Sequence, residues 1–192
     1  TCDRPCRACP RRRAARRDVA AARRPVTEPL LQGLAAVAGP STRLLVLGSF
    51  PGQASLAAQQ YYGHPRNQFW PLLAALWQQP LAAWPYAQRV AWVQQQGLGL
   101  WDVYARCRRP GSLDGDIRDA ELNDLPGLVA TLPGLRLIAH NGGESARCMR
   151  ITRALGLPVL QLPSTSPANA SWSFERKRSA WQSAFEQAGL LG

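Results

Sequence analysis

The stretch LLVLGSFPGQASLAAQQYYGHPRNQFW, residues 44–70, decides the fold that we expect for this chain. It begins with four apolar residues (44–47), a run that is typical of a buried β-strand. A sharp GSFPG turn (48–52) follows, and then a loop that contains two tyrosines, a histidine and an asparagine. In open parallel α/β sheets, ligands bind beyond the carboxyl ends of the strands. We therefore expect an active site in this loop.

The rest of the chain alternates between strand and helix patterns. Apolar runs predict strands at residues 43–47, 98–103, 135–139 and 158–162. Helical patterns lie between and after them, at residues 67–78, 85–96, 120–131, 143–155 and 173–188. Such alternation is typical of βαβ units with a parallel sheet and helices on both faces. We predict an α/β protein, a three-layer α/β/α sandwich around a central four-stranded parallel sheet.

Positive charge is concentrated in the first residues. The 192 residues carry a formal net charge of +11 at pH 7. Residues 1–24 contain nine arginines and two acids, whereas residues 25–192 contain fourteen basic and ten acidic side chains. An excess of basic charge indicates a polyanionic partner such as nucleic acid. We predict a basic, disordered extension over residues 1–30 and one folded domain over residues 31–192.

The cysteines indicate a reducing compartment. There are five of them, Cys2, Cys6, Cys9, Cys107 and Cys148. An odd number without a signal-peptide pattern predicts free thiols in the cytoplasm. The spacing of the first three is similar to that of a metal site, with the fourth ligand supplied by Cys107 or Cys148; the alternative, which we adopt, is a tail without metal or cofactor. No apolar run approaches the about 18 residues of a membrane span.

Polar and aromatic residues follow each predicted strand. The second strand leads into WDVYARCRRPGSLDGDI (101–117), the third into HNGG (140–143) and the fourth into PSTSPANASWSF (163–174). Right-handed crossovers bring the carboxyl ends of parallel strands to one edge of the sheet. Four separate loops are therefore expected to converge on one site.

These segments resemble the uracil-DNA glycosylase superfamily. GSFPG is similar to its first motif, LPSTSPANA (162–170) to its second, and HNGG to the FNG element of the mismatch-specific uracil and thymine glycosylases. The block QYYGHPRNQFW (60–70) and the PSTSPAN segment resemble the hypoxanthine-DNA glycosylase (DNA-deoxyinosine glycosylase) family within it. The resemblance covers roughly residues 31–190 and implies a monomeric bacterial repair enzyme of the cytoplasm, associated with the nucleoid, whose partner is DNA containing deaminated bases.

Two positions depart from the best-studied members of the superfamily. Phe50 stands where they have an aspartate or asparagine that handles the attacking water, and Leu162 stands where the uracil-specific enzymes have a histidine. The hypoxanthine family lacks both groups as well, and its resemblance implies that Asn67 is the catalytic residue. The alternative is that Asn67 only caps the following helix. His64 is a second catalytic candidate, because histidine exchanges protons near neutral pH. The alternative is that His64 is a hydrogen-bonding loop residue.

The predicted base pocket combines the first motif with the strand ends. The resemblance implies that Tyr62 stacks on a flipped base, with Phe50 as a second candidate, unless both are core aromatics. Asp102 and Asn141 are expected to read the edge of the base, or to cap a turn and a helix. We expect His140 to be a hydrogen-bonded core residue. The complete predicted pocket is Gly48, Ser49, Phe50, Pro51, Gly52, Tyr62, Phe69, Asp102 and Asn141.

The loop after the fourth strand is the predicted DNA-binding segment. Small polar residues stiffened by proline suit a loop that enters the minor groove and contacts phosphates. Basic residues at the start of the last helix are expected to neutralise phosphates, the alternative being a solvated helix face. The predicted DNA-binding residues are Ser164, Thr165, Ser166, Pro167, Ala168, Asn169, Arg176 and Lys177.

Hydrolysis of an N-glycosidic bond without strand cleavage is the predicted reaction. Strand cleavage needs an amine that forms a Schiff base, and the only lysine, Lys177, lies in the DNA-binding segment. Alternatives are a mismatch-type uracil or xanthine glycosylase and a non-catalytic module that binds damaged DNA. A nucleotide-binding loop is disfavoured because GSFPG lacks the Gly-Lys-Ser/Thr ending of a P-loop.

Overall fold

The computed structural model describes residues 28–191, and its centre is a four-stranded parallel sheet. The predicted tail, with Cys2, Cys6 and Cys9, lies outside these residues apart from its last few. The strand order is β3 (Leu98–Asp102), β2 (Leu44–Gly48), β6 (Leu137–Asn141) and β7 (Val159–Leu162). Each strand overlaps one of the four predicted apolar runs. The predicted central sheet is therefore confirmed.

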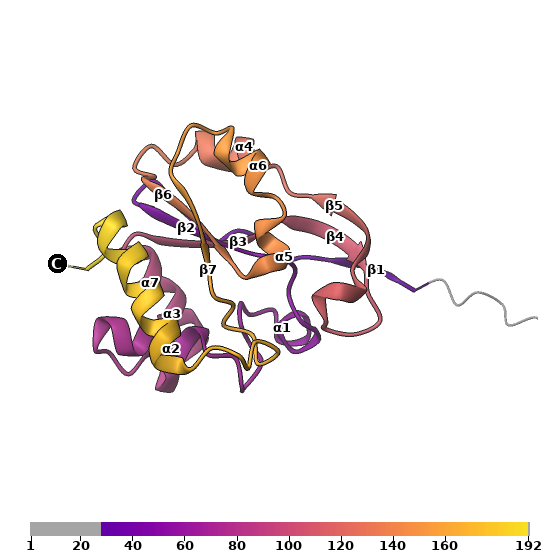
Figure 1. Ribbon diagram of the computed structural model, residues 1–192, viewed down its shortest axis with the longest axis horizontal. Coiled ribbons are helices and arrows are strands. Elements are labelled where there is room, and N and C mark those ends of the chain that lie inside the picture. The colour runs from indigo at the N-terminus through magenta and orange to yellow at the C-terminus, as the bar shows by residue number, and fades with distance from the viewer. Residues whose placement is uncertain (1–27, 192) are drawn as a thin grey trace, which may run out of the picture.

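Helices cover both faces of this sheet (Figure 1). One face carries α2 (Phe69–Trp77), α3 (Tyr86–Gln95) and α7 (Phe174–Ala188). The other face carries α4 (Leu125–Ala130) and α6 (Met149–Arg153). The remaining helices are α1 (Gln53–Ala58), α5 (Gly143–Ala146), η1 (Leu81–Ala83) and η2 (Asp114–Asp116). The predicted three-layer α/β/α sandwich is confirmed.

Alternate side chains of the central strands supply two separate cores. In β2, Leu44 and Val46 face the larger core with Phe69, Trp181 and the other apolar residues of α2 and α7. Leu45 and Leu47 face the smaller core under α4. Burial on both faces explains why this strand has no polar residue. Because all four strands are parallel, the loops that follow them meet at one edge of the sheet.

A second, antiparallel sheet was not predicted. It has the order β1 (Leu30–Gln32), β4 (Tyr104–Arg108) and β5 (Arg118–Leu122). All five residues of β5 are exposed, and the ion pair between Arg106 and Glu121 (2.7 Å) links it to β4. A strand without an apolar face gives no hydrophobic alternation from which to predict it.

The first half of the predicted helix 120–131 is wrong, because this segment contains the end of strand β5. Backbone hydrogen bonds to β4 hold residues up to Leu122 in the sheet. The helix begins only at Leu125, where the Asp124 carboxylate accepts a hydrogen bond from the Gly127 backbone N–H (2.9 Å). The predicted helix 143–155 is likewise divided into α5 and α6. Among residues 28–191, no helix is long and apolar enough to cross a membrane.

Candidate active site

A cavity of about 780 Å³ opens at the carboxyl edge of the central sheet. Its size lies within the usual range of small-molecule pockets. It is lined by the turn after β2, the loop before α2, the end of β3, the η2 segment, the start of α5 and the loop after β7. Among the predicted residues, those that line it are Gly48, Ser49, Phe50, Pro51, Gly52, Tyr62, His64, Asn67, Asp102, Asn141, Ser164, Thr165, Ser166, Pro167, Ala168 and Asn169.

Tyr62 is a strained aromatic in the pocket wall. Its backbone has φ of +55°, a left-handed conformation that side chains with a Cβ rarely adopt. Its ring stacks on Phe69, with 3.8 Å between the ring centroids. Phe69 itself is fully buried behind Tyr62 and supports the pocket from the core, without being part of its lining. Strain of this kind persists where surrounding contacts hold it, and it is concentrated at functional sites.

Asn67 makes a local backbone contact and also lines the cavity. Its Oδ1 accepts a hydrogen bond from the Phe69 backbone N–H (2.9 Å), the first N–H of α2, while Gln68 between them is the N-cap residue. The same residue lines the cavity. Because Oδ1 is held by the backbone, the amide nitrogen is the group left to donate to a bound molecule. This backbone contact therefore orients Asn67 as a hydrogen-bond donor.

His64 and Asn141 are partly committed to structural contacts. His64 Nδ1 accepts a hydrogen bond from the Arg66 backbone N–H (3.1 Å), which leaves Nε2 as its free nitrogen. Asn141 uses both ends of its amide on Thr165: Nδ2 donates to Oγ1 and Oδ1 accepts from the backbone N–H, each at 3.0 Å. Asn141 therefore clamps the loop after β7 against the end of β6.

Asp102 is the least compensated charge-bearing group in the pocket. Its side chain ends β3 and is 4% exposed. Within the described part of the chain, its Oδ2 atom is buried and has no hydrogen-bond partner. Burial raises the pKa of this carboxyl to about 7; the neighbouring Asp114 raises it further and Arg109 opposes the rise. A carboxyl group of this kind is neutral at low pH and ionises near neutrality.

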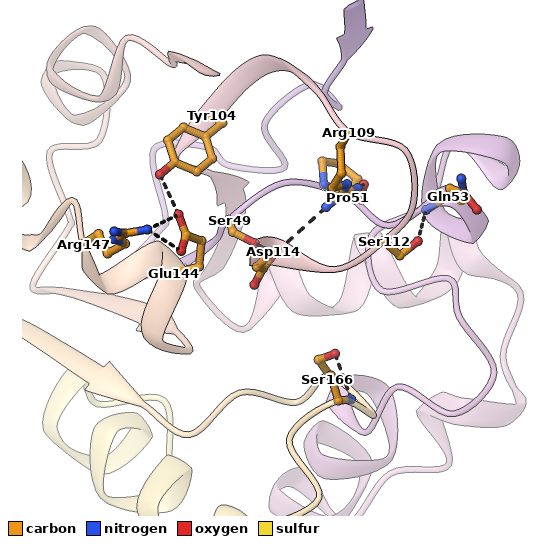
Figure 2. A network of polar contacts seen from close by, with 11 residues as sticks. Ser49, Pro51, Gln53, Tyr104, Arg109, Ser112, Asp114, Glu144, Arg147 and Ser166 are labelled. Carbon is orange, nitrogen blue, oxygen red and sulfur yellow. Dashed lines mark hydrogen bonds and ion pairs between the residues drawn. The ribbon is translucent and has the colours of Figure 1, made fainter. Parts of the chain in front are cut away.

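A polar network that the sequence did not single out braces the first motif (Figure 2). Ser49 Oγ donates a hydrogen bond to Asp114 Oδ1 (2.7 Å), and Arg109 Nη1 lies 3.9 Å from the same oxygen. Arg109 also donates to the Pro51 carbonyl (2.5 Å) and stacks on the Phe50 ring at 5.2 Å. The one available signal for Asp114 and Arg109 was their place after a predicted strand.

His140 is a core residue, as predicted. Its ring is fully buried, with Nδ1 2.8 Å from Ser145 Oγ and Nε2 2.9 Å from Thr152 Oγ1. Burial lowers the pKa of His140 to about 4, although the bond to Ser145 opposes the change. The imidazole is therefore neutral at physiological pH. No group of three or more metal-binding side chains lies among residues 28–191.

Comparison with known proteins places this architecture in a family. The sequence profile described as the Uracil DNA glycosylase superfamily matches residues 36–186, most of the chain. The chain belongs to the uracil DNA glycosylase superfamily. A solution NMR structure from Methanosarcina acetivorans, provisionally named a uracil DNA glycosylase, has a TM-score of 0.76 and 35% sequence identity, with coverage of 84% of this chain and 99% of the other.

Two curated relatives of this superfamily member are named hypoxanthine DNA glycosylase. The protein from Methanosarcina barkeri is 37% identical over 156 residues, which cover 81% of this chain and 98% of its own length. The protein from Methanosarcina acetivorans is 38% identical over 154 residues, with coverage of 80% and 97%. The expected superfamily and its nearest subfamily resemblance are confirmed.

Lys177 of this superfamily member does not lie where the sequence led us to expect. Its side chain is 1% exposed, and its ammonium donates to Gln68 Oε1 (2.8 Å) and to the Asn169 carbonyl (2.9 Å). The prediction that Lys177 contacts a phosphate is therefore wrong, because its ammonium is buried and bound to other residues of the chain. Arg176, its neighbour, is exposed and stacks on Trp172 at 4.4 Å. Consecutive residues of a helix point to different faces, so the basic run 176–178 cannot present all of its side chains to DNA.

Proposed function

We propose that this DNA glycosylase hydrolyses the bond between deoxyribose and hypoxanthine at deoxyinosine, leaving an abasic site. The observation that carries the proposal is that Tyr62, Asn67 and Asp102 line one cavity, together with the polar loop after β7. The relatives named hypoxanthine DNA glycosylase support the choice of base. The base must leave the helix stack to enter such a cavity.

The reaction is carried by charge stabilisation. Cleavage of the N-glycosidic bond generates an oxocarbenium-like sugar and an electron-rich leaving base. Phe50, in the first motif, has no group that can deprotonate water. The Asn67 amide nitrogen instead donates to the leaving base or holds the attacking water, and a preorganised donor of this kind contributes about 10²–10³ in rate. Tyr62 supplies an aromatic face on which the flipped base stacks.

The loop after β7 holds the DNA in this proposal. Residues 164–169 are anchored from three sides: by Asn141 at the end of β6, by Lys177 of α7 and by the Gln68 backbone N–H, which donates to the Thr165 carbonyl (3.0 Å). A rigid loop loses little conformational entropy when it binds. Arg176 is the exposed basic residue beside it and neutralises a phosphate.

The enzyme is proposed to be monofunctional. Strand cleavage would need an amine that attacks C1′ of the sugar. Lys177 is the only lysine in the sequence, and its ammonium is buried and engaged in two hydrogen bonds. Treatment of a reaction mixture with borohydride is expected to trap no covalent complex. We also propose a monomer that acts in the cytoplasm, which light scattering and cell fractionation test.

Two other functions fit parts of the site. A uracil or xanthine glycosylase would use the same cavity, since both bases carry lactam groups similar to that of hypoxanthine. The second alternative is a non-catalytic module that binds damaged DNA, because Phe50 in the first motif has no group that can deprotonate water. Turnover separates this last function from an enzyme.

The test uses duplex oligonucleotides that contain one deoxyinosine, deoxyuridine or deoxyxanthosine opposite each normal base. Abasic sites are counted after alkaline cleavage. We expect more abasic sites than enzyme molecules with deoxyinosine, at a higher rate than with the other two bases. Preferential turnover of deoxyuridine would favour the uracil glycosylase, and a gel shift without cleavage of any substrate would favour the binding module.

A further inference from the structure

Asp102 is a buried acid whose Oδ2 atom has no hydrogen-bond partner in the described part of the chain. Its Oδ2 has no hydrogen bond to any residue in the range 28–191, and its neighbour Arg109 forms no ion pair with it. An uncompensated carboxylate in a protein interior is costly. Asp102 also lines the cavity, where a bound molecule can supply the missing hydrogen-bond partner.

The surroundings hold this carboxyl group in place. Asp102 pairs with Gly48 in the ladder between β3 and β2, and a Cβ at Gly48 would collide with Asp102 Oδ1. The Tyr62 hydroxyl lies 3.7 Å from the same Cβ position, and in the described residues it too lacks a partner. The Asn123 side chain donates to the Asp102 carbonyl (2.8 Å), which fixes the end of the strand. Glycine at position 48 therefore leaves room for the Asp102 carboxyl group to lie over the first motif, beside Tyr62.

We propose that Asp102 is the general acid of the reaction, which transfers its proton to the purine ring as the base leaves. This inference rests on the proposed function. The bond between C1′ and N9 breaks, and its electron pair passes into the base. N7 of hypoxanthine takes the proton from Asp102, so that the base departs neutral. Water forms the new bond to C1′, and the proton that it loses returns through solvent to the Asp102 carboxylate.

The acid has the right protonation behaviour for this role. Burial and the nearby Asp114 keep the proton on Asp102 up to neutral pH, while Arg109 weakly favours its release. Tyr61 and Tyr62 also face it, and burial raises the pKa of both phenols, so they remain neutral. His64 shares the cavity as a further titratable group. Catalytic acids work best when their pKa lies near the working pH.

The variant that tests the proposal is Asp102→Asn, which keeps the shape of the side chain but has no proton to transfer. We expect its single-turnover rate on deoxyinosine to fall by about 10²–10⁴-fold. The wild-type rate should decline as the pH rises above neutrality, and this decline should be absent from the variant. Asp124→Asn is the matched control, since asparagine also caps α4 and the residue lies outside the cavity.

A second substrate separates proton transfer from base recognition and from folding. A base methylated at N7, as in 7-methyldeoxyinosine, is already cationic and leaves neutral without a proton. The proposal predicts that Asp102→Asn cleaves this substrate at a rate within about threefold of the wild type, because the step that needs the acid is bypassed. Equal losses on both substrates would overturn it in favour of a positioning role.

The outcomes also distinguish this inference from the proposed function. If the wild-type protein releases hypoxanthine but Asp102→Asn does so at the same rate and with the same pH profile, the general-acid role is wrong and the function stands. If the wild-type protein releases no hypoxanthine from deoxyinosine, the proposed function is wrong and the inference falls with it.

Discussion

The Lys177 ammonium donates a hydrogen bond to Gln68 Oε1 across 2.8 Å, which links the last helix to the residue that precedes α2. The same ammonium donates to the Asn169 carbonyl in the loop after β7. Two segments that line the candidate active site, residues 62–68 and 164–169, are thereby linked by one side chain, in addition to the backbone hydrogen bond from Gln68 to Thr165. Burial lowers the pKa of Lys177, but both of its hydrogen-bond partners favour the charged form.

The first prediction contrasts two adjacent basic residues. Arg176→Gln removes an exposed cation, so the slope of log K against log salt for DNA binding should fall by about 1. Lys177→Met removes a buried cation, which should leave that slope unchanged. Leaving buried acceptors without a donor costs about 1–3 kcal/mol, so Lys177→Met should lower the free energy of unfolding by that amount. Fluorescence anisotropy at several salt concentrations and urea denaturation provide the two measurements. A reduced salt slope in Lys177→Met would mean that the lysine reaches DNA after all.

The second prediction separates the two roles of Asn67. Asn67→Asp keeps an oxygen that accepts from the Phe69 backbone N–H but removes the amide donor. Its stability should match the wild type, while the single-turnover rate on deoxyinosine should fall by about 10²–10³-fold. Asn67→Ala removes both groups and should also lose about 1 kcal/mol of stability. Full activity in Asn67→Asp would reduce Asn67 to a helix cap.

The third prediction concerns the glycine beneath the candidate acid. In Gly48→Ala the new methyl group collides with Asp102 Oδ1, and the neighbouring strands leave little room for it to move. Overpacking of this kind costs about 1–3 kcal/mol, and the displaced carboxyl group should lower the cleavage rate. Gly39→Ala is the matched control, because within residues 28–191 no atom outside its chain neighbours lies within 4 Å of the Cβ that it adds. Equal activity of the two variants would argue against a fixed Asp102.

The fourth prediction is that Asp102→Asn is more stable than the wild-type protein at alkaline pH. The folded-state pKa of Asp102 is raised from 3.8 to about 7, so the folded protein holds its proton where the unfolded chain has lost it. The contribution of this group to stability is therefore fully present below the unfolded pKa and is lost as the pH rises through about 7. Asp102→Asn removes this cost, which for such a shift is on the order of 4 kcal/mol. Urea denaturation should find the variant more stable than the wild type at pH 8 and similar to it at pH 3.5.

A lack of stabilisation at pH 8 would mean that Asp102 finds a partner or solvent in the folded protein. Asp124→Asn controls for the loss of an acidic residue, since asparagine can fill the same N-cap position. A variant that is more stable but less active would agree with the cost that functional sites impose on folding.

The sequence alone determined the central sheet and the place of the site. Strands such as Leu44–Gly48 are apolar on both faces because both faces are buried, and this pattern is legible without a structure. The polar residues after each strand meet because parallel strands end at one edge of the sheet. Motif resemblance then identified the superfamily, which the match over residues 36–186 bears out.

Tertiary structure decided what each polar group is free to do. The exposed strand Arg118–Leu122 has no hydrophobic period, and its backbone pairing with the preceding strand β4 makes it a strand. Lys177 and Arg176 are neighbours in sequence, yet one is buried and the other exposed, because the helix rotates by about 100° at each residue. Asp102 became a candidate acid only because its Oδ2 is buried without a hydrogen-bond partner among the described residues. Burial and hydrogen bonding depend on which distant residues fill the space around a side chain, and no local pattern encodes this.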